Sequence, residues 1–362
     1  MTQLTVRAIR CTAVEVPMKH ELGTSRARIR AAPLMLIDVE TEEGVTGRAY
    51  LFCYVRAAAA GIRGMLEEVE RLVKGQRVDP QTQFAALAKR FTLIGVQGIV
   101  RMALSGYDVA AWDALAIAAG EPLGKFLGAT KGSMRAYNSN GLGLMEPARL
   151  ADEAEALLEG GFSAVKLRLG HETLEGDLAA LHAVRKRIGT AIDIMVDYNQ
   201  ALSVDEALLR GKALDAEGVY WLEEPIRHDD YAGAARLAAA LKTPVQIGEN
   251  FSLPEAMEEA IERKACDYAM PDLERIGGVT GWRRAAAIAE RRGIPMSSHL
   301  FPEVSAHLLA MTPTAHWLEY VDWAASILEE PLRIEKGSAV LPSRPGSGIS
   351  WERNAVERYR IP

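Results

Sequence analysis

Short apolar runs that end in polar residues recur from Arg135 to about residue 330, and stretches rich in Ala, Leu and Glu lie between them. The runs are MRAYNSN, FSAVKLRLG, IDIMVDYNQ, VYWLEEP, PVQIGEN, DYAMPD, IPMSSH and AHWLEY. Seven charged or polar residues mark the run ends at intervals of 31, 26, 26, 23, 27 and 20 residues: Lys166, Asp197, Glu223, Glu249, Asp272, His299 and Glu319. This alternation of strand and helix predicts an α/β protein, and eight regular units favour a closed barrel over an open, doubly wound sheet.

The first third of the chain has a different pattern, with strands placed before helices. Residues 34–40 and 41–54 predict an antiparallel hairpin, because their apolar runs flank a Glu43-Gly44 turn. Helical spacing of apolar residues follows at 57–73 and 98–119. We therefore expect an α+β domain over 1–130 and a barrel over 131–330. The turn-rich segment 331–362 is expected to pack back on the first domain.

Composition narrows the class of protein. Of the 362 residues, 49% are apolar and 25% are charged, which is ordinary for a globular protein and excludes disorder. A net charge of −6 argues against nucleic acid as a partner. The three cysteines have no disulfide or zinc-site spacing, and the sequence has no secretory signal and no apolar run of about 18 residues. We expect a cytoplasmic protein with no membrane partner and a small-molecule substrate.

Three acidic residues end consecutive units of the repeat. Asp197, Glu223 and Glu249 would meet at the carboxyl end of a barrel, where active sites of this fold lie. Each alone could be a helix cap or a solvated loop acid. Together they need a cation, and an all-oxygen donor set favours Mg²⁺, with Mn²⁺ possible. In WLEEP only one of the two Glu residues is expected to face inward.

Other polar residues share the same predicted location. Lys166 and Arg168 lie two apart and share one face of their strand, where they would meet anions. An exposed edge strand is the alternative, but a closed barrel has no edge. His299 and Asp272 end adjacent units, so the carboxylate could orient the imidazole as a general acid or base. Glu319, if protonated in a desolvated site, could donate to a developing oxyanion.

These motifs together resemble one family. The set KLR, MVDYNQ, WLEEP, IGEN, MPDLERIGGVTGW, SSHLF and HWLE, with the N-terminal segments APLMLIDV and SGYDVAAWDALA, resembles the mandelate racemase subgroup of the enolase superfamily. The likeness covers essentially the whole chain. It implies a (β/α)7β TIM-type barrel with an N-terminal α+β capping domain, and Mg²⁺-dependent abstraction of a proton next to a carboxylate.

The resemblance also implies roles for individual residues. Asp197, Glu223 and Glu249 would hold the metal. His299 backed by Asp272 would be an acid/base, and Glu319 an electrophilic acid. Lys166 would contact the substrate carboxylate and Asn199 its α-hydroxyl. We also expect substrate contacts from Ser139, Phe52 and Tyr54, and from Arg26 in a basic lid at residues 18–30.

Arg168 departs from the family pattern, because the racemases have Lys-x-Lys where this chain has Lys-x-Arg. A guanidinium stays protonated at neutral pH and is a poor base, so proton exchange on two faces is in doubt. We therefore predict dehydration of an acid sugar, a small anionic 2-hydroxy carboxylate, to a 2-keto acid. A racemase or epimerase of a mandelate-like acid is the second hypothesis, and a catalytically idle, ligand-binding barrel is the third. Relatives of this kind commonly assemble as homo-oligomers, and we expect the same here.

Overall fold

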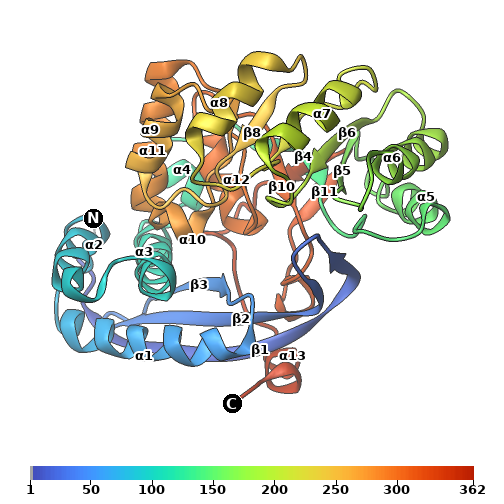
Figure 1. Cartoon of the computed structure of the whole chain (residues 1–362). Helices are drawn as coiled ribbons and strands as arrows, with labels where there is room; N and C mark the ends of the chain where they lie inside the picture. The colour runs from blue at the N-terminus through green and yellow to red at the C-terminus, as the bar shows by residue number, and fades with distance from the viewer. Residues whose placement is uncertain (1–2) are drawn as a thin grey trace.

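A three-stranded antiparallel sheet begins the computed structural model, which describes residues 3–362 (Figure 1). Its strands are β1 (Val6–Gly23), β2 (Arg28–Thr41) and β3 (Thr46–Phe52). The predicted hairpin is confirmed as β2 and β3, and Gly44 takes a positive φ of 82° in the turn between them. The long strand β1 was not predicted. It pairs with β2, and the predicted lid at 18–30 is the far tip of this β1–β2 hairpin.

Helices pack against this sheet and against one another. They are α1 (Arg56–Val73), α2 (Pro80–Arg90), η1 (Thr92–Ile94) and α3 (Gly98–Ala118). The helices predicted at 57–73 and 98–119 match α1 and α3 to within one residue at each end. Helix α3 is buried along nearly its whole length because it lies between the sheet and the rest of the molecule (Figure 1). We call β1–β3 with α1–α3 the capping unit.

Parallel strands form the second part of the fold. They are β4 (Ser133–Asn138), β5 (Ala164–Arg168), β6 (Asp193–Asp197), β7 (Leu222–Glu223), β8 (Val245–Ile247), β9 (Tyr268–Ala269) and β10 (Leu318–Tyr320). Strands β4 to β9 pair in chain order, and β10 returns to pair with β4. The run IPMSSH is not a continuous strand: single bridges from Met296 to Ala269 and Ala315 complete the circuit. The predicted barrel is therefore confirmed.

Helices surround the barrel strands. They are α4 (Leu123–Phe126), α5 (Pro147–Ala156), α6 (Leu174–Ile188), α7 (Val204–Leu214), α8 (Tyr231–Ala240), α9 (Pro254–Glu262), α10 (Leu273–Ile276), α11 (Gly278–Arg292) and α12 (Pro302–Ala310). After η2 (Ala325–Ile327), the hairpin of β11 (Arg333–Glu335) and β12 (Ser338–Val340) joins the start of β4. Helix α13 (Arg353–Tyr359) then reaches the capping unit beside β1.

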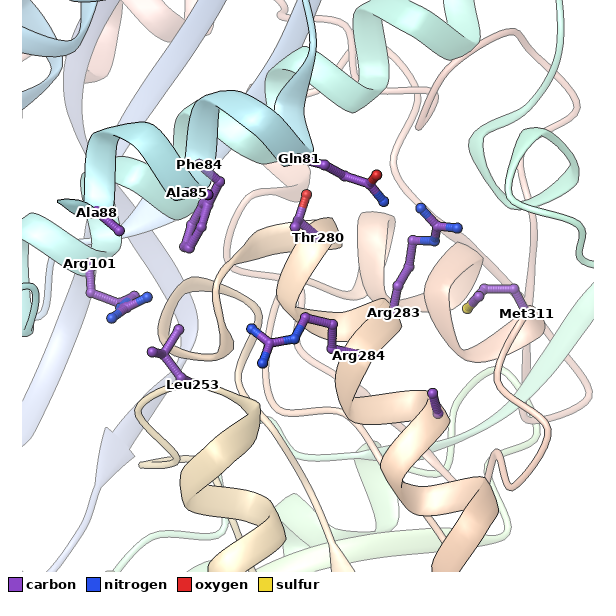
Figure 2. Close-up of a pocket in the computed structure, with 11 residues that line it drawn as sticks. Gln81, Phe84, Ala85, Ala88, Arg101, Leu253, Thr280, Arg283, Arg284 and Met311 are labelled. Carbon is purple, nitrogen blue, oxygen red and sulfur yellow. The ribbon is translucent and has the colours of Figure 1, made fainter. Parts of the chain in front are cut away.

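Two buried aspartates of α3 tie the capping unit to the barrel and to the C-terminal segment. Asp108 accepts hydrogen bonds from the backbone and hydroxyl of Thr280 in α11, which lies beside α2 and α3 (Figure 2). Gly278 packs so closely here that a Cβ would lie 2.5 Å from Asp108 Oδ2. Asp113 accepts from the backbone N–H groups of Arg48 and Ser347. These contacts hold the capping unit over the carboxyl end of the barrel strands, called the barrel mouth below.

A buried Tyr–Glu pair at this junction predicts a pH effect on stability. Tyr50 of β3 donates to Glu303 of α12 at 2.5 Å, and burial raises the pKa of Glu303 from its usual 4.5 to about 7. The native protein thus keeps a proton that the unfolded chain releases, so stability falls as pH rises from 4.5 to about 7. The free energy of unfolding of the wild-type protein should fall by about 3 kcal/mol over this pH range, and we expect Glu303→Gln to abolish this fall.

Urea unfolding of both proteins at several pH values measures this difference. Glu290→Gln, which changes an exposed carboxylate on α11, is the control and should keep the wild-type slope. A Glu303→Gln protein with the wild-type pH dependence would contradict the assignment.

Candidate active site

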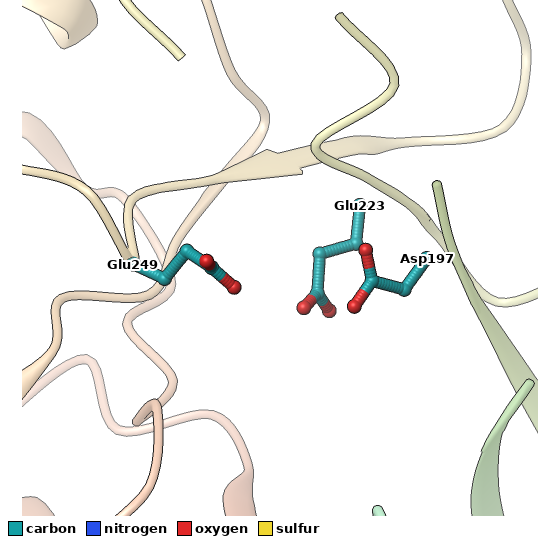
Figure 3. A group of neighbouring side chains, drawn as sticks. All are labelled: Asp197, Glu223 and Glu249. Carbon is teal, nitrogen blue, oxygen red and sulfur yellow. The ribbon is translucent and has the colours of Figure 1, made fainter. Parts of the chain in front are cut away.

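Three carboxylates converge at the barrel mouth (Figure 3). Asp197 and Glu223 are the last residues of β6 and β7, and Glu249 follows β8 by two residues. One oxygen from each carboxylate can be chosen so that all three lie within 4.8 Å of one another. Such a set of hard oxygen donors suits Mg²⁺, which in proteins keeps several water or substrate ligands besides carboxylates. The residues therefore fit the predicted metal.

Neighbouring side chains orient two of these carboxylates. Glu223 Oε2 accepts hydrogen bonds from Trp221 Nε1 at 3.0 Å and from Gln246 Nε2 at 3.3 Å. Asp197 accepts from the backbone N–H of Asn199 at 2.7 Å and from its amide at 3.0 Å. Burial raises the pKa of Glu223 to about 8, and like charge from Asp197 adds to this effect. A divalent cation among the carboxylates reverses that direction, because it favours their ionised forms.

Gln246 offers a test of this arrangement. Its amide touches Glu223 and the sulfur of Met270, and it lies fully buried on β8. We expect Gln246→Leu to weaken Mg²⁺ binding by about tenfold to a hundredfold, the usual effect of losing a hydrogen bond to a ligand. Titration calorimetry with Mg²⁺ measures it. Gln3→Leu, an exposed change before β1, is the control, and equal affinities for all three proteins would count against the role of Gln246.

Lys166 lies at the centre of the carboxylate group. Its ammonium is 2.7 Å from Glu223 Oε1, 2.7 Å from Glu319 Oε1 and 3.3 Å from Asp197 Oδ2. Burial on its own lowers the pKa of Lys166, but these three carboxylates outweigh it and raise the pKa well above its usual value. The side chain is therefore a fixed positive charge in a site that excludes water.

Glu319 accepts a hydrogen bond at each of its carboxylate oxygens. Its Oε1 accepts from Ser139 Oγ at 2.7 Å, and its Oε2 accepts from the backbone N–H of Leu300 at 2.8 Å. Burial on its own raises the pKa of Glu319. The charges of Lys166 and His299, together with hydrogen bonds, outweigh burial and lower the pKa well below its usual value. Protonated Glu319, expected from the sequence as an acid that donates to an oxyanion, stays a prediction, and its contact with Lys166 works against it.

His299 and Asp272 form the predicted pair. The His299 Nδ1 lies 2.6 Å from Asp272 Oδ2, and Asp272 Oδ1 is held by backbone N–H groups of Glu274 and Arg275. The other ring nitrogen, Nε2, lies 3.3 Å from Glu249 Oε2 and 4.0 Å from Glu319 Oε2. Burial lowers the pKa of His299, but the surrounding carboxylates outweigh it and raise the pKa to about 9. The imidazole thus has its second nitrogen, Nε2, directed at the carboxylate group.

Arg168 lies inside the barrel with Lys166 but contacts a different set of atoms. Its guanidinium donates to the backbone oxygens of Gly141 at 2.7 Å and Ser139 at 3.1 Å, and to Ser139 Oγ at 3.2 Å. Ser139 Oγ in turn donates to Glu319. Arg168 therefore fixes the loop after β4 and, through Ser139, the position of Glu319.

The tip of the β1–β2 hairpin covers the barrel mouth. Arg26 donates to the backbone oxygens of Asn199 and Gln200, which follow β6. At Gly143 a Cβ would lie 2.4 Å from the oxygen of Gly23, so the hairpin and the loop after β4 touch backbone to backbone. This contact places the hairpin as a lid, closed over the site.

Phe52 and Tyr54, expected to contact the substrate, belong to an aromatic cluster. Phe52 packs against Tyr54 and Trp323, with ring centroids 4.4 and 5.0 Å away. The Tyr54 hydroxyl is buried and has no hydrogen-bond partner among the residues described. The guanidinium of Arg275 lies 4.9 Å from the Tyr54 ring centre.

Sequence reasoning missed several residues of the site. Glu224 was expected to face away from Glu223, but its positive φ of 34° takes it out of the strand, and both side chains are buried. Asn250 donates to Glu224, and Arg275 donates to Asn250 and to the backbone of Glu249. Two consecutive acids before a proline were the only available signal for this part of the network.

Family models match both parts of the chain. Residues 7–128 match the N-terminal domain of the mandelate racemase and muconate lactonizing enzyme family, and residues 149–355 match the enolase C-terminal domain-like family. The chain belongs to the enolase superfamily. The N-terminal model names the mandelate racemase and muconate lactonizing enzyme subgroup, and this agrees with the resemblance drawn from the motifs.

Individual relatives support the same assignment. The chain is 30% identical to the L-talarate/galactarate dehydratase of Salmonella typhimurium over 324 residues, 89% of this chain and 81% of that protein. An enolase from alpha proteobacterium bal199 with bound magnesium has 43% identity and a TM-score of 0.97, covering 99% of this chain and 100% of that one. An enolase from Bradyrhizobium, in complex with magnesium and mandelic acid, has 39% identity and a TM-score of 0.95, and both chains are covered completely.

These similarities confirm the predicted fold, the enzyme class and the cofactor. The superfamily members that resemble this chain are named dehydratases, cycloisomerases and racemases, and magnesium is the ion in the two similar structures described above. No helix among residues 3–362 is long and apolar enough to cross a membrane.

Proposed function

We propose that the protein dehydrates an acid sugar, a 2-hydroxy carboxylate, to a 2-keto acid, with Asp197, Glu223 and Glu249 holding Mg²⁺. The metal when bound polarises the substrate carboxylate and stabilises the enediolate, which would otherwise be too high in energy. Lys166 is the fixed cation that contacts the same carboxylate. The named activities of similar proteins, which include several sugar-acid dehydratases, support this substrate class.

In this proposal His299 carries out both proton transfers. Its Nε2 takes the α-proton, while the Nδ1 hydrogen bond to Asp272 stabilises the charged imidazolium. The electron pair of the broken C–H bond enters the enediolate and then expels the β-hydroxyl group, which leaves as water with the proton from His299. The enol product takes up a proton at the β-carbon, releases the proton of its hydroxyl group, and becomes the 2-keto acid. Asn199 and Ser139 border this reacting centre.

The contacts of Arg168 are the observation that carries the choice of reaction. Three of its N–H···O hydrogen bonds go to the loop after β4, and a guanidinium stays protonated at neutral pH. A racemase needs a base on each face of the α-carbon, whereas dehydration needs one acid/base. His299 supplies that single group.

Racemisation or epimerisation of a mandelate-like acid is the second candidate. The aromatic cluster of Phe52, Tyr54 and Trp323 favours it, because these rings suit an apolar substrate. The lid also has less free positive charge than its sequence indicates, since Arg28 and Arg30 both pair with Glu21. An idle, ligand-binding barrel is the third candidate, and the intact His299–Asp272 pair argues against it.

Incubation of the Mg²⁺-loaded protein in D₂O distinguishes these reactions. The panel contains galactarate, gluconate, arabinonate, xylonate and both enantiomers of mandelate. Dehydration predicts a 2-keto acid from at least one sugar acid and no inverted mandelate. Inverted mandelate carrying deuterium at the α-carbon, with no keto acid from any sugar acid, would replace dehydration by racemisation. Turnover and exchange absent from the whole panel would favour the idle barrel.

Three further features stay predictions. We propose that the protein works in the cytoplasm, where its three free cysteines would stay reduced, and that it forms a homo-oligomer. We also keep the division into a capping domain over 1–130, a barrel over 131–330 and a C-terminal segment over 331–362. Light scattering after gel filtration measures the oligomeric state directly.

A further inference from the structure

A cavity of about 660 Å³ lies between the capping unit and the barrel, away from the barrel mouth (Figure 2). Helices α2 and α3 line one side, and α11 with Leu253 lines the other. None of the residues placed in the candidate active site above lines this cavity. Its volume is in the range that binds small organic molecules.

The lining is positively charged and has no acidic side chain. Arg101, Arg283 and Arg284 all contribute to it. Arg284 pairs with Glu255, which lies outside the lining, and Arg283 has no ion pair among residues 3–362. Its guanidinium lies 5.2 Å from the ring centre of Trp112. The cavity therefore has an excess of positive charge.

Arg101 is the unusual member of this group. It is only 5% exposed, and of its three guanidinium nitrogens only Nη2 has a partner in the described chain, the backbone oxygen of Val96 at 2.8 Å. Figure 2 shows the guanidinium extending between Phe84 and Leu253 toward Arg284. A buried charged group with two unused donors is costly, and a ligand that accepts from both removes the cost.

The rest of the lining is apolar and sets the kind of anion. Phe84, Leu253 and Met311 are its larger members, and the Arg101 guanidinium lies 5.6 Å from the Phe84 ring centre. A carboxylate suits a buried guanidinium because its charged oxygens accept hydrogen bonds from the N–H groups and neutralise the charge. Burial lowers the pKa of Arg101 to about 10, which still leaves it charged at neutral pH.

We propose that this cavity is a second ligand site, which binds a small carboxylate with an apolar body. The carboxylate pairs with Arg101 and is attracted by Arg283 and Arg284, and the apolar body packs against Phe84 and Leu253. The bound molecule touches α2 and α3 on one side and α11 on the other, so it fastens the capping unit to the barrel.

4-Bromobenzoate is a suitable probe, tested on the Mg²⁺-loaded protein by titration calorimetry and by anomalous scattering from soaked crystals. We expect bromine in the cavity and binding that becomes about tenfold weaker or more in Arg101→Met. The exposed change Arg90→Gln on α2 is the matched control and should bind like wild type. The uncharged analogue 4-bromobenzamide should not bind there.

A carboxylate probe can also enter the active site, and the variants separate the two locations. Binding at the barrel mouth should not depend on Arg101. If Arg101→Met does not fold, the double variant Arg283→Gln/Arg284→Gln on α11 replaces it and should also weaken binding in the cavity. Bromine only at the barrel mouth, binding at crystal concentration only, equal affinity in Arg101→Met and wild type, or a cavity closed by a second copy of the chain would each overturn the proposal.

Discussion

Replacing His299 with Asn is expected to lower kcat by about 10²–10⁴-fold, the usual contribution of a positioned acid/base. Asn has a similar shape and can still hydrogen-bond to Asp272, but it cannot carry a proton between the α-carbon and the leaving group. His299 holds none of the metal-ligand positions, so Mg²⁺ affinity should change little. Steady-state kinetics on the best substrate of the panel and calorimetry with Mg²⁺ measure the two quantities separately.

His182→Asn is the matched control for this change. His182 lies on α6 with an exposed side chain 2.8 Å from Glu217, which is not a residue of the site. This variant should keep wild-type kinetics. Unchanged turnover and unchanged α-proton exchange in His299→Asn would remove His299 from the mechanism, and with it the single acid/base on which the proposed dehydration depends.

The positions of the charged residues could be predicted from the sequence because of the geometry of parallel barrels. Apolar strand interiors force the first polar residue after each run to the same end of the barrel, which brought Asp197, Glu223 and Glu249 together. The pairing of His299 with Asp272 followed from the same rule for adjacent units. Periodicity carries this information without any knowledge of side-chain contacts.

What the side chains contact could not be predicted in the same way. The sequence placed Arg168 on the inward face, but its choice of Gly141 and Ser139 backbone oxygens depends on the path of the loop after β4. The lowered pKa of Glu319 depends on the 2.7 Å contact with Lys166, a distance that no pattern encodes. Strand β1 was missed because basic, acidic and small residues interrupt its apolar alternation, and pairing with β2 supplies what its own sequence lacks.

Replacing Lys166 with Met is expected to have opposite effects on turnover and on metal binding. In the proposed mechanism the ammonium faces the negative charge that develops on the substrate carboxylate, so its loss should lower kcat/KM by about 10²–10³-fold or more. In the absence of substrate the same ammonium competes with the metal for Asp197 and Glu223. Its removal therefore leaves uncompensated carboxylates, and Mg²⁺ should bind about tenfold more tightly.

Glu223→Gln separates this prediction from a general disturbance of the site. It removes a ligand charge while keeping the shape of the side chain, so Mg²⁺ affinity should fall together with turnover. Calorimetry should thus show Mg²⁺ affinity rising in Lys166→Met and falling in Glu223→Gln. Kinetics should show a loss of activity in both variants. If Lys166→Met also weakened Mg²⁺ binding, the lysine would be a structural support of the carboxylate group, and its proposed contact with the substrate carboxylate would lose its basis.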